Sequence, residues 1–193
     1  MSAAHMVLCV AACFSAVCGS GTFQDETGQS ACKLCAVGKA QNGEARESQC
    51  TTCEAGKYSP TEGSKMCFSC QLGSHAPNEG HDDTQCTPCP AGSFSDTPAA
   101  TSCKPCPIGG FCASEGAADA SEAFQQCPTG TYNTETGSDS ETACIECEVG
   151  KANPVPGSES IDVCKLCVPG TYAGQPASQY VGAATCSACV HAR

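Results

Sequence analysis

The sequence has few of the residues that build a hydrophobic core. Tryptophan is absent, and Leu (4), Ile (3), Val (10) and Phe (6) contribute only 23 of the 193 residues. Chains in which these four types fall below about 20% tend toward disorder, because they cannot bury enough apolar surface to offset the conformational entropy lost on folding. An ordinary globular domain is therefore excluded, and something other than an apolar core must hold the chain together.

Positive charge is scarce as well. Lysine and arginine number nine against 20 aspartates and glutamates, which gives a net charge of −11. Proteins that grip phosphate are basic, because lysine and arginine must displace counterions. An acidic chain is also repelled by anionic membrane surfaces. We therefore expect no nucleic-acid partner and interpret the charge as a source of solubility.

Long apolar runs are missing except near the amino terminus. Residues 6–17 form an apolar run of about a dozen residues, which is too short for a transmembrane helix but typical of a secretory signal. The short segment before it contains no Lys or Arg. We predict a signal peptide at residues 1–17, cleaved near residues 15–20, and a chain that is secreted or lies on the extracellular face of the cell surface. No transmembrane segment is expected in this chain.

Cysteine is what the chain has in abundance. Its 21 cysteines are about 11% of the sequence, above the roughly 8–10% that marks a disulfide scaffold in a short chain. They belong to an internal repeat with a period of 17 to 21 residues. We number nine repeats from the cysteine that opens each of these phrases: CGSGTF at 18, CAVGKA at 35, CEAGKY at 53, CQLGSH at 70, CPAGSF at 89, CPIGGF at 106, CPTGTY at 127, CEVGKA at 147 and CVPGTY at 167.

Two further places in the repeat carry a pattern. Glycine at the third place after the cysteine indicates a turn with positive φ or close approach of a neighbouring segment. An aromatic at the fifth place is expected to cover the adjacent disulfide. The glycines are Gly21, Gly38, Gly56, Gly73, Gly92, Gly109, Gly130, Gly150 and Gly170, and the aromatics are Phe23, Tyr58, Phe94, Phe111, Tyr132 and Tyr172.

Each repeat continues from this extended piece through a Gly/Ser-rich turn and returns to the next cysteine, which predicts an irregular hairpin. The predicted fold class is a small disulfide-rich repeat array, mostly coil with short β-hairpins. Repeats that touch only their neighbours should form an elongated rod. The pattern breaks once, where Phe124 replaces a cysteine. We therefore predict a front array at 18–112, an alanine-rich spacer at 113–126 with room for one helical turn, and a rear array at 127–193.

Three chemistries use paired cysteines at such spacing. Zinc ribbons are compatible with the spacing alone, but histidines 75, 81 and 191 lie at unrelated places and the chain is not basic. A thioredoxin-type dithiol needs a pair at the start of a helix in a βαβ frame, and nothing here alternates strand and helix. Disulfides in an oxidising compartment are favoured, while a zinc array and a disulfide oxidoreductase remain as alternatives. No enzyme, metal site or cofactor is expected.

The phrase C-P-x-G-[ST]-[FY] followed by C-x2-C, as in CPAGSF at 89 and CPTGTY at 127, resembles the cysteine-rich ephrin-receptor-like repeats. It is similar, more loosely, to the cysteine-rich modules of tumour necrosis factor and growth factor receptors. The resemblance covers residues 18–189. It implies an extracellular, disulfide-laddered array that serves as a spacer, adhesion or protein-binding module, as part of a larger receptor-like protein. A fold analogy does not transfer a ligand, so the expected partner is an extracellular protein or glycan of unknown identity.

The resemblance also implies a disulfide ladder, in which the second cysteine of one pair bonds the first cysteine of the next. A competing scheme joins first to first and second to second, such as Cys32–Cys50 with Cys35–Cys53, and the sequence leaves it open. Carried over, the ladder is Cys18–Cys32, Cys35–Cys50, Cys53–Cys67, Cys70–Cys86, Cys89–Cys103, Cys106–Cys112, Cys127–Cys144, Cys147–Cys164 and Cys167–Cys186.

Cys189 has no partner in this ladder. It stands at the place that opens a new loop in earlier repeats, with only four residues after it. An odd cysteine in a secreted chain usually pairs between molecules or exposes a reactive thiol. We expect an intermolecular disulfide through Cys189, or an array that continues in a longer protein.

Overall fold

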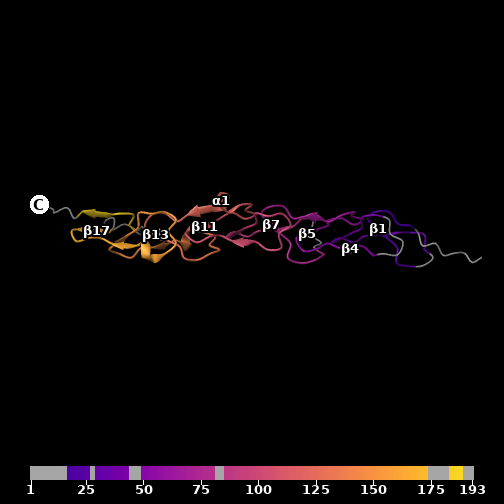
Figure 1. Cartoon of the computed structure of the whole chain (residues 1–193), viewed down its shortest axis with the longest axis horizontal. Helices are drawn as coiled ribbons and strands as arrows, with labels where there is room; N and C mark the ends of the chain where they lie inside the picture. Colours follow the sequence, from indigo (N-terminus) through magenta and orange to yellow (C-terminus); the bar gives the residue numbers. More distant parts are fainter. Residues whose placement is uncertain (1–16, 27–28, 44–48, 81–84, 174–182, 189–193) are drawn as a thin grey trace, which may run out of the picture. The chain divides into compact units, whose positions relative to one another are not determined.

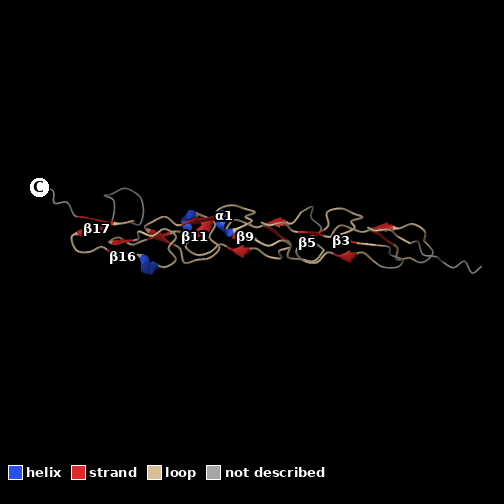
Figure 2. Ribbon diagram, turned by 45° about the horizontal axis from the view of Figure 1, so that its top comes forward, coloured by secondary structure: helices blue, strands red, loops and turns tan. Residues whose placement is uncertain are grey.

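The computed structural model describes residues 17–26, 29–43, 49–80, 85–173 and 183–188. Their backbone consists of turns and short two-stranded antiparallel hairpins (Figure 2). The chain divides into two compact units, the first made of residues 1–68 and 79–85 and the second of residues 69–78 and 86–193. The predicted fold class, a disulfide-rich array of mostly coil with short β-hairpins, is confirmed. Its elongated shape stays a prediction.

Each repeat forms one hairpin, and within the second unit the hairpins follow one another in chain order from β7 to β17 (Figure 1). Each pairs the strand after the repeat's glycine with the two or three residues that precede the next repeat. The first three pairs are β1 (Thr22–Phe23) with β2 (Lys33–Leu34), β3 (Lys39–Ala40) with β4 (Thr51–Thr52), and β5 (Lys57–Tyr58) with β6 (Phe68–Ser69).

The second unit contains six hairpins and three short helical turns. The hairpins are β7 (Ser74–His75) with β8 (Thr87–Pro88), β9 (Ser93–Phe94) with β10 (Lys104–Pro105), β11 (Gly110–Cys112) with β12 (Phe124–Gln126), β13 (Thr131–Tyr132) with β14 (Ile145–Glu146), β15 (Lys151–Ala152) with β16 (Lys165–Leu166), and β17 (Thr171–Ala173) with β18 (Cys186–Ala188). The helical turns are α1 (Ala120–Ala123), η1 (Glu141–Ala143) and η2 (Ile161–Val163).

The glycine at the third place shapes the start of every hairpin. All nine of these glycines have a positive φ, between 73° and 89°. In repeat 5, the Ser93 N–H donates to the Pro90 carbonyl across the turn, and the Gly92 carbonyl accepts from the Cys106 N–H. A φ near +80° at the third residue of such a turn is the type II geometry, which glycine adopts without steric cost. The turn thereby sets the direction of the strand that follows.

Nine disulfides close the loops in the described residues. They join the same cysteine pairs as the ladder that the resemblance implies, with Cα–Cα distances of 5.5 to 6.1 Å. Cys189 lies outside the described residues, as does the predicted signal peptide apart from Val17. The buried hydrophobic residues are cysteines, five alanines and the rings of Phe94, Phe111 and Tyr132. Disulfide sulfur therefore takes the place of an aliphatic core.

Backbone hydrogen bonds join each repeat to its neighbours. The N–H of a third-place glycine donates to the sixth-place carbonyl of the next repeat, as Gly92 does to Cys112 at 2.8 Å. The same glycine also meets the loop turn of the repeat after that. A Cβ added at Gly92 would lie 2.3 Å from the Gly137 carbonyl oxygen, two repeats along the chain. Repeats 1, 2, 4, 5 and 6 each make this approach to the repeat two places further along the chain.

The loop turns themselves need a positive φ, and one of them lacks glycine. Gly63, Gly116, Gly137 and Gly157 have φ between 67° and 78° and donate their N–H to a cysteine carbonyl in an earlier repeat. Ala99 takes this place in repeat 5, with φ 55° and an N–H bond of 2.8 Å to the Cys70 carbonyl. A left-handed conformation costs an L-residue about 1–2 kcal/mol, so Ala99 carries backbone strain.

We expect Ala99→Gly to raise the free energy of unfolding by about 1 kcal/mol, because the left-handed conformation then loses its steric cost. The change should raise the denaturation midpoint measured in guanidinium with the disulfides intact. Ala100→Gly is the control, because Ala100 has no positive φ and its substitution only adds flexibility to the unfolded chain. A destabilised Ala99→Gly variant would contradict the prediction.

The segment predicted as a spacer is folded into the array. Gly116 forms the loop turn, the Asp119 side chain caps α1 by accepting the Ser121 N–H at 2.7 Å, and β12 pairs with β11. The helical turn expected here is present as α1. The division between the two compact units falls near residues 68–86 rather than in this segment. The arrays at 18–112 and 127–193 therefore stay a prediction.

Two departures from the repeat pattern in this segment explain one another. A Cβ at the fourth-place residue Gly110 would lie 2.2 Å from the Gln125 carbonyl oxygen and 2.5 Å from the ring of Phe124, which stands at the place of the missing cysteine. Every other repeat has a side chain at that fourth place. Cys112, fully buried at the sixth place, instead bonds back to Cys106. A small ring and a packed phenylalanine replace the usual long disulfide loop.

Candidate functional site

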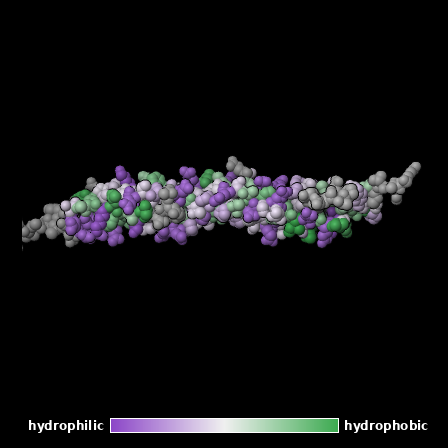
Figure 3. All heavy atoms as spheres, turned by 180° about the vertical axis from the view of Figure 1, so that it is seen from behind, coloured by the Kyte–Doolittle hydropathy of each residue, from purple (hydrophilic) through white to green (hydrophobic). Residues whose placement is uncertain are grey.

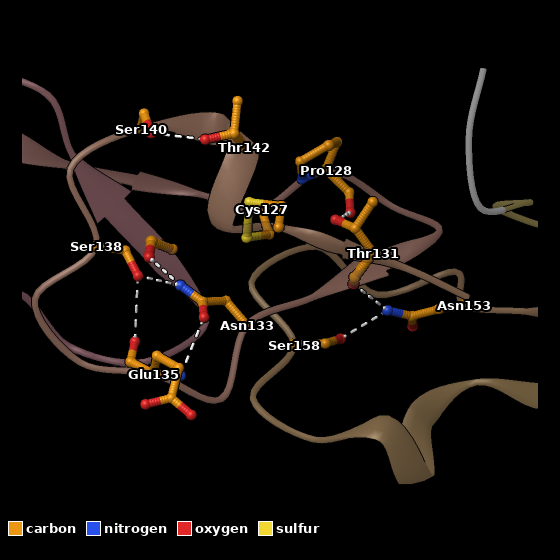
Figure 4. The surroundings of a disulfide bond; sticks show 12 residues. Cys127, Pro128, Thr131, Asn133, Glu135, Ser138, Ser140, Thr142, Asn153 and Ser158 are labelled. Atoms are coloured by element: carbon orange, nitrogen blue, oxygen red, sulfur yellow. Dashed lines mark hydrogen bonds between the residues drawn. A yellow bond between two sulfur atoms is a disulfide. The ribbon is translucent and has the colours of Figure 1, made fainter. Parts of the chain in front are cut away.

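Two asparagines at the sixth place of their repeats are fully buried, and each ties its loop to the preceding hairpin (Figure 4). Asn133 Nδ2 donates to the Gly110 carbonyl and to Ser138 Oγ, both at 2.8 Å, while its Oδ1 accepts the Glu135 N–H at 3.0 Å. Buried polar groups are costly unless they are hydrogen-bonded. Here the amide meets that requirement with partners from two repeats.

Asn153 repeats this arrangement one repeat later. Its Nδ2 donates to the Thr131 carbonyl and to Ser158 Oγ at 2.9 Å, and its Oδ1 accepts the Val155 N–H at 3.0 Å. Gln24 holds the loop of repeat 1 in a related way, through the Ala31 carbonyl and the Glu26 N–H. Through Asn133 and Asn153, the sixth place therefore joins adjacent repeats by side-chain hydrogen bonds, which is a structural role.

Sequence reasoning missed the sixth place because no single residue type marks it. Its buried occupants are Gln24, Ser59, Ala76, Ser95, Cys112, Asn133 and Asn153. What these residues share is that each is uncharged and either small or able to satisfy itself with an amide. This restricted set of residue types at the sixth place was the sequence signal that could have identified it.

We expect Asn153→Ala to lower the free energy of unfolding by about 1–3 kcal/mol, because it leaves the Thr131 carbonyl and the Val155 N–H without their buried partners. Guanidinium denaturation with the disulfides intact measures the change. Asn78→Ala is the matched control, since Asn78 is exposed and a surface substitution should change stability by no more than about 0.5 kcal/mol. Equal effects of the two substitutions would mean that the hydrogen bonds of Asn153 do not stabilise the fold.

Two of the fifth-place aromatics, Phe94 and Tyr132, pack on a disulfide as predicted, and this disulfide belongs to the following repeat. Tyr132 of repeat 7 packs with Cys147 and Cys164 of repeat 8, together with Val163. Phe94 of repeat 5 packs with Cys106 and Cys112 of repeat 6 and with the alanines around α1. A ring on the neighbour's disulfide couples the repeats as the backbone bonds do.

The strand that precedes each new repeat faces outward. β2, β4, β6, β8, β10, β14 and β16 each consist of two exposed residues. Their sequences vary along the array, from Lys-Leu at 33–34 and 165–166 to Thr-Thr, Phe-Ser and Ile-Glu. The cysteines and third-place glycines thus recur along the array, while the residue types at the outward places vary.

Several outward residues are large and apolar. Leu166 is 75% exposed and Val149 is 98% exposed, and further examples are Leu34, Phe68, Leu72, Ile145, Val155 and Val168. On the face shown in Figure 3, hydrophobic atoms gather in separate patches among polar ones. Exposed apolar patches framed by polar residues are a common feature of interaction surfaces.

Four of the described lysines form short-range ion pairs, namely Lys33, Lys57, Lys104 and Lys151. Lys104 Nζ lies 2.6 Å from Asp96 Oδ1, and Lys33 Nζ lies 2.7 Å from Asp25 Oδ1. The hydrogen bond from each lysine holds the pKa of its aspartate below the usual value. This contribution to stability is present at neutral pH and is lost as the pH falls through the lowered pKa. It is small, because the pairs are exposed to solvent.

No helix among the described residues has the length and apolar character needed to cross a membrane. Residues 80–122 match the family model described as tyrosine-protein kinase ephrin type A/B receptor-like. This segment holds the cysteines from Cys86 to Cys112. The chain therefore contains a cysteine-rich ephrin-receptor-like repeat. None of the curated proteins compared with the chain matches it.

Proposed function

We propose that the chain is a non-enzymatic, extracellular cysteine-rich array that presents a variable surface to a protein or glycan partner. The observation that carries the proposal is the division of labour within each repeat. The cysteines and third-place glycines recur from repeat to repeat and are mostly buried, whereas the two residues before seven of the repeats are exposed and vary in type. A constant frame with a changing outer row suits recognition better than catalysis.

The disulfides support an oxidising location for this module. Eighteen cysteines of the described residues are paired, and disulfides of this number persist in secreted and extracellular proteins rather than in the cytosol. The alternative of an intracellular zinc array needs the same sulfurs as thiolates, which the paired framework does not offer. The alternative of a disulfide oxidoreductase needs a cysteine pair at the start of a helix. The described C-x2-C pairs instead lie on either side of two-residue strands.

Expression in a secretory host tests the location and the class together. We expect a chain in the medium whose native form has no titratable thiols at the eighteen paired cysteines and contains no stoichiometric zinc. A chain that accumulates only in the cytosol, with free thiols and several zinc ions, would overturn the proposal in favour of the zinc array.

Binding is tested on the secreted chain by immobilising it and probing it with a panel of extracellular domains and glycans. We expect a bound partner to be lost in Leu166→Glu or Val149→Glu, which place a charge on the exposed apolar surface without touching the frame. Asp139→Ala, an exposed change at a turn, is the control and should keep the partner. Binding that survives every outward substitution but is lost with the frame would contradict the assignment of the surface.

A further inference from the structure

His75 occupies the fifth place of repeat 4, where most repeats carry an aromatic ring. Like those rings it lies against the disulfide of the following repeat, here Cys89–Cys103. Its Nδ1 lies 3.2 Å from Cys103 Sγ and 3.1 Å from the Thr87 carbonyl oxygen, to which an Nδ1–H donates. Covering a disulfide does not require a ring nitrogen, because the rings of Phe94 and Tyr132 cover disulfides without one.

The three side chains form a compact group of metal-binding atoms. One ring nitrogen of His75 and the Sγ atoms of Cys89 and Cys103 all lie within 4.8 Å of one another. Cys89 is fully buried, whereas His75 and Cys103 are half-buried. Both half-buried residues line a groove of about 520 Å³, together with Pro77, Pro90 and Pro105. Cys103 is therefore the half of this disulfide that faces the groove.

We propose that His75, Cys89 and Cys103 form a zinc site that is closed by the disulfide and opened by its reduction. This inference is independent of the proposed binding function, since it concerns one disulfide and its neighbour. The reductant is a small thiol, and the ligand is Zn²⁺, which favours thiolate and imidazole ligands in four-coordinate sites.

The redox step balances with two equivalents of thiol. The thiolate of an external thiol that enters the groove attacks Cys103 Sγ and breaks the Sγ–Sγ bond. This step forms a mixed disulfide at Cys103 and releases Cys89 as a thiolate. A second thiolate attacks the outer sulfur of the mixed disulfide and releases Cys103. The two electrons and two protons pass from the external thiols to the cysteine pair, and the external thiols leave as their disulfide.

The released atoms fit a zinc ion with modest movement. Zinc–sulfur bonds of about 2.3 Å and zinc–nitrogen bonds of about 2.0–2.1 Å place tetrahedral ligand atoms roughly 3.5–3.8 Å apart. The group already lies inside 4.8 Å, and reduction frees the two sulfurs to separate. Zinc displaces the thiol protons, and the fourth position faces the groove, where water or a further ligand completes the shell. Ligation through Nδ1, the ring nitrogen that lies on Cys103 Sγ, requires this atom to give up its hydrogen bond to the Thr87 carbonyl.

The test uses the full disulfide-bonded chain and Zn²⁺ as the probe. A water-soluble phosphine opens the disulfides in graded amounts without oxygen and is then removed, zinc is added, and thiols are alkylated and mapped by mass spectrometry. We expect zinc to slow alkylation of Cys89 and Cys103 by about tenfold or more, because ligated thiolate is withdrawn from reaction. Absorption of the Co²⁺-substituted chain should show sulfur-to-metal charge transfer.

Two substitutions decide whether the histidine makes the site. His75→Phe restores the usual residue of this place, so the repeat should keep its fold while the zinc protection of Cys89 and Cys103 falls to the background level. The Cys147–Cys164 disulfide, which Tyr132 covers, is the internal control and should show no protection. Tyr132→His should transfer protection to that pair.

Equal zinc protection in the parent chain and in His75→Phe would overturn the proposal, as would protection of Cys147 and Cys164 in the parent. Absence of protection at Cys89 and Cys103 after the phosphine has opened that disulfide would also overturn it. The oxidised chain should bind no zinc at these residues, and zinc bound there before reduction would remove the disulfide from its role.

Discussion

Reduction of the disulfides unfolds the chain completely under conditions that are otherwise native. We expect the reduced and alkylated chain to lose its circular-dichroism spectrum and to be cut by protease throughout, whereas the oxidised chain is cut only near its exposed turns. In the chain-entropy model a bridge that closes about 15 residues contributes roughly 3 kcal/mol, and eight of the nine bridges have sequence separations of 14 to 19.

The other contributions cannot replace these bridges. Apart from cysteine, the buried hydrophobic residues of the described chain are five alanines and three aromatic rings. The strands of the hairpins are two or three residues long, and isolated two-stranded hairpins are marginal in water. The sixth-place asparagines depend on loops that the bridges hold closed. Alkylation of the oxidised chain under the same conditions is the control. A reduced chain that keeps its protease resistance would show that the backbone hydrogen bonds between repeats are enough to keep the chain folded.

The repeat pattern predicted what is local to one repeat. The nine glycines with positive φ, the hairpin and the closing turn depend on residues within about 20 positions of one another, so their spacing records them. The pairing of the cysteines depended on the family resemblance, because spacing alone left a second scheme open. The structure has the pairs that the resemblance implies.

The third-place glycine predicted a turn or the close approach of a neighbouring segment, but the partners in the contacts between repeats were not predicted, and the reason is physical. A periodic sequence states that each repeat meets others in the same way, but it does not state which repeat or through which atoms. The contact of Gly92 with Gly137 spans two repeats and uses only backbone atoms. The sixth place accepts any small or amide side chain, and His75 appeared unrelated to the repeat until the structure put it at the aromatic place on a disulfide.

Close approach between repeats makes Gly92→Ala one of the most damaging small substitutions in the chain. Gly92 has φ +83°, and a Cβ there would lie 2.3 Å from the Gly137 carbonyl oxygen, an atom that the backbone holds in place. The left-handed conformation costs about 1–2 kcal/mol, and forcing the two backbones apart should add about 1–3 kcal/mol. The substitution therefore affects both the turn and the joint between repeats 5 and 7.

Gly150→Ala separates these two causes. Gly150 holds the same place in repeat 8 with φ +87°, and like Gly92 its carbonyl accepts the N–H of the next repeat's cysteine at 2.8–2.9 Å. A Cβ at Gly150, however, would meet nothing within 4 Å. We expect Gly150→Ala to cost only the conformational term of about 1–2 kcal/mol. Guanidinium denaturation with intact disulfides measures both variants, and amide hydrogen exchange locates the damage. Exchange at Gly137, whose N–H donates to the Cys106 carbonyl at 2.9 Å, should accelerate in Gly92→Ala and stay unchanged in Gly150→Ala. Equal losses of stability in the two variants would mean that the glycines serve only their own turns and that repeats 5 and 7 are not held by this approach.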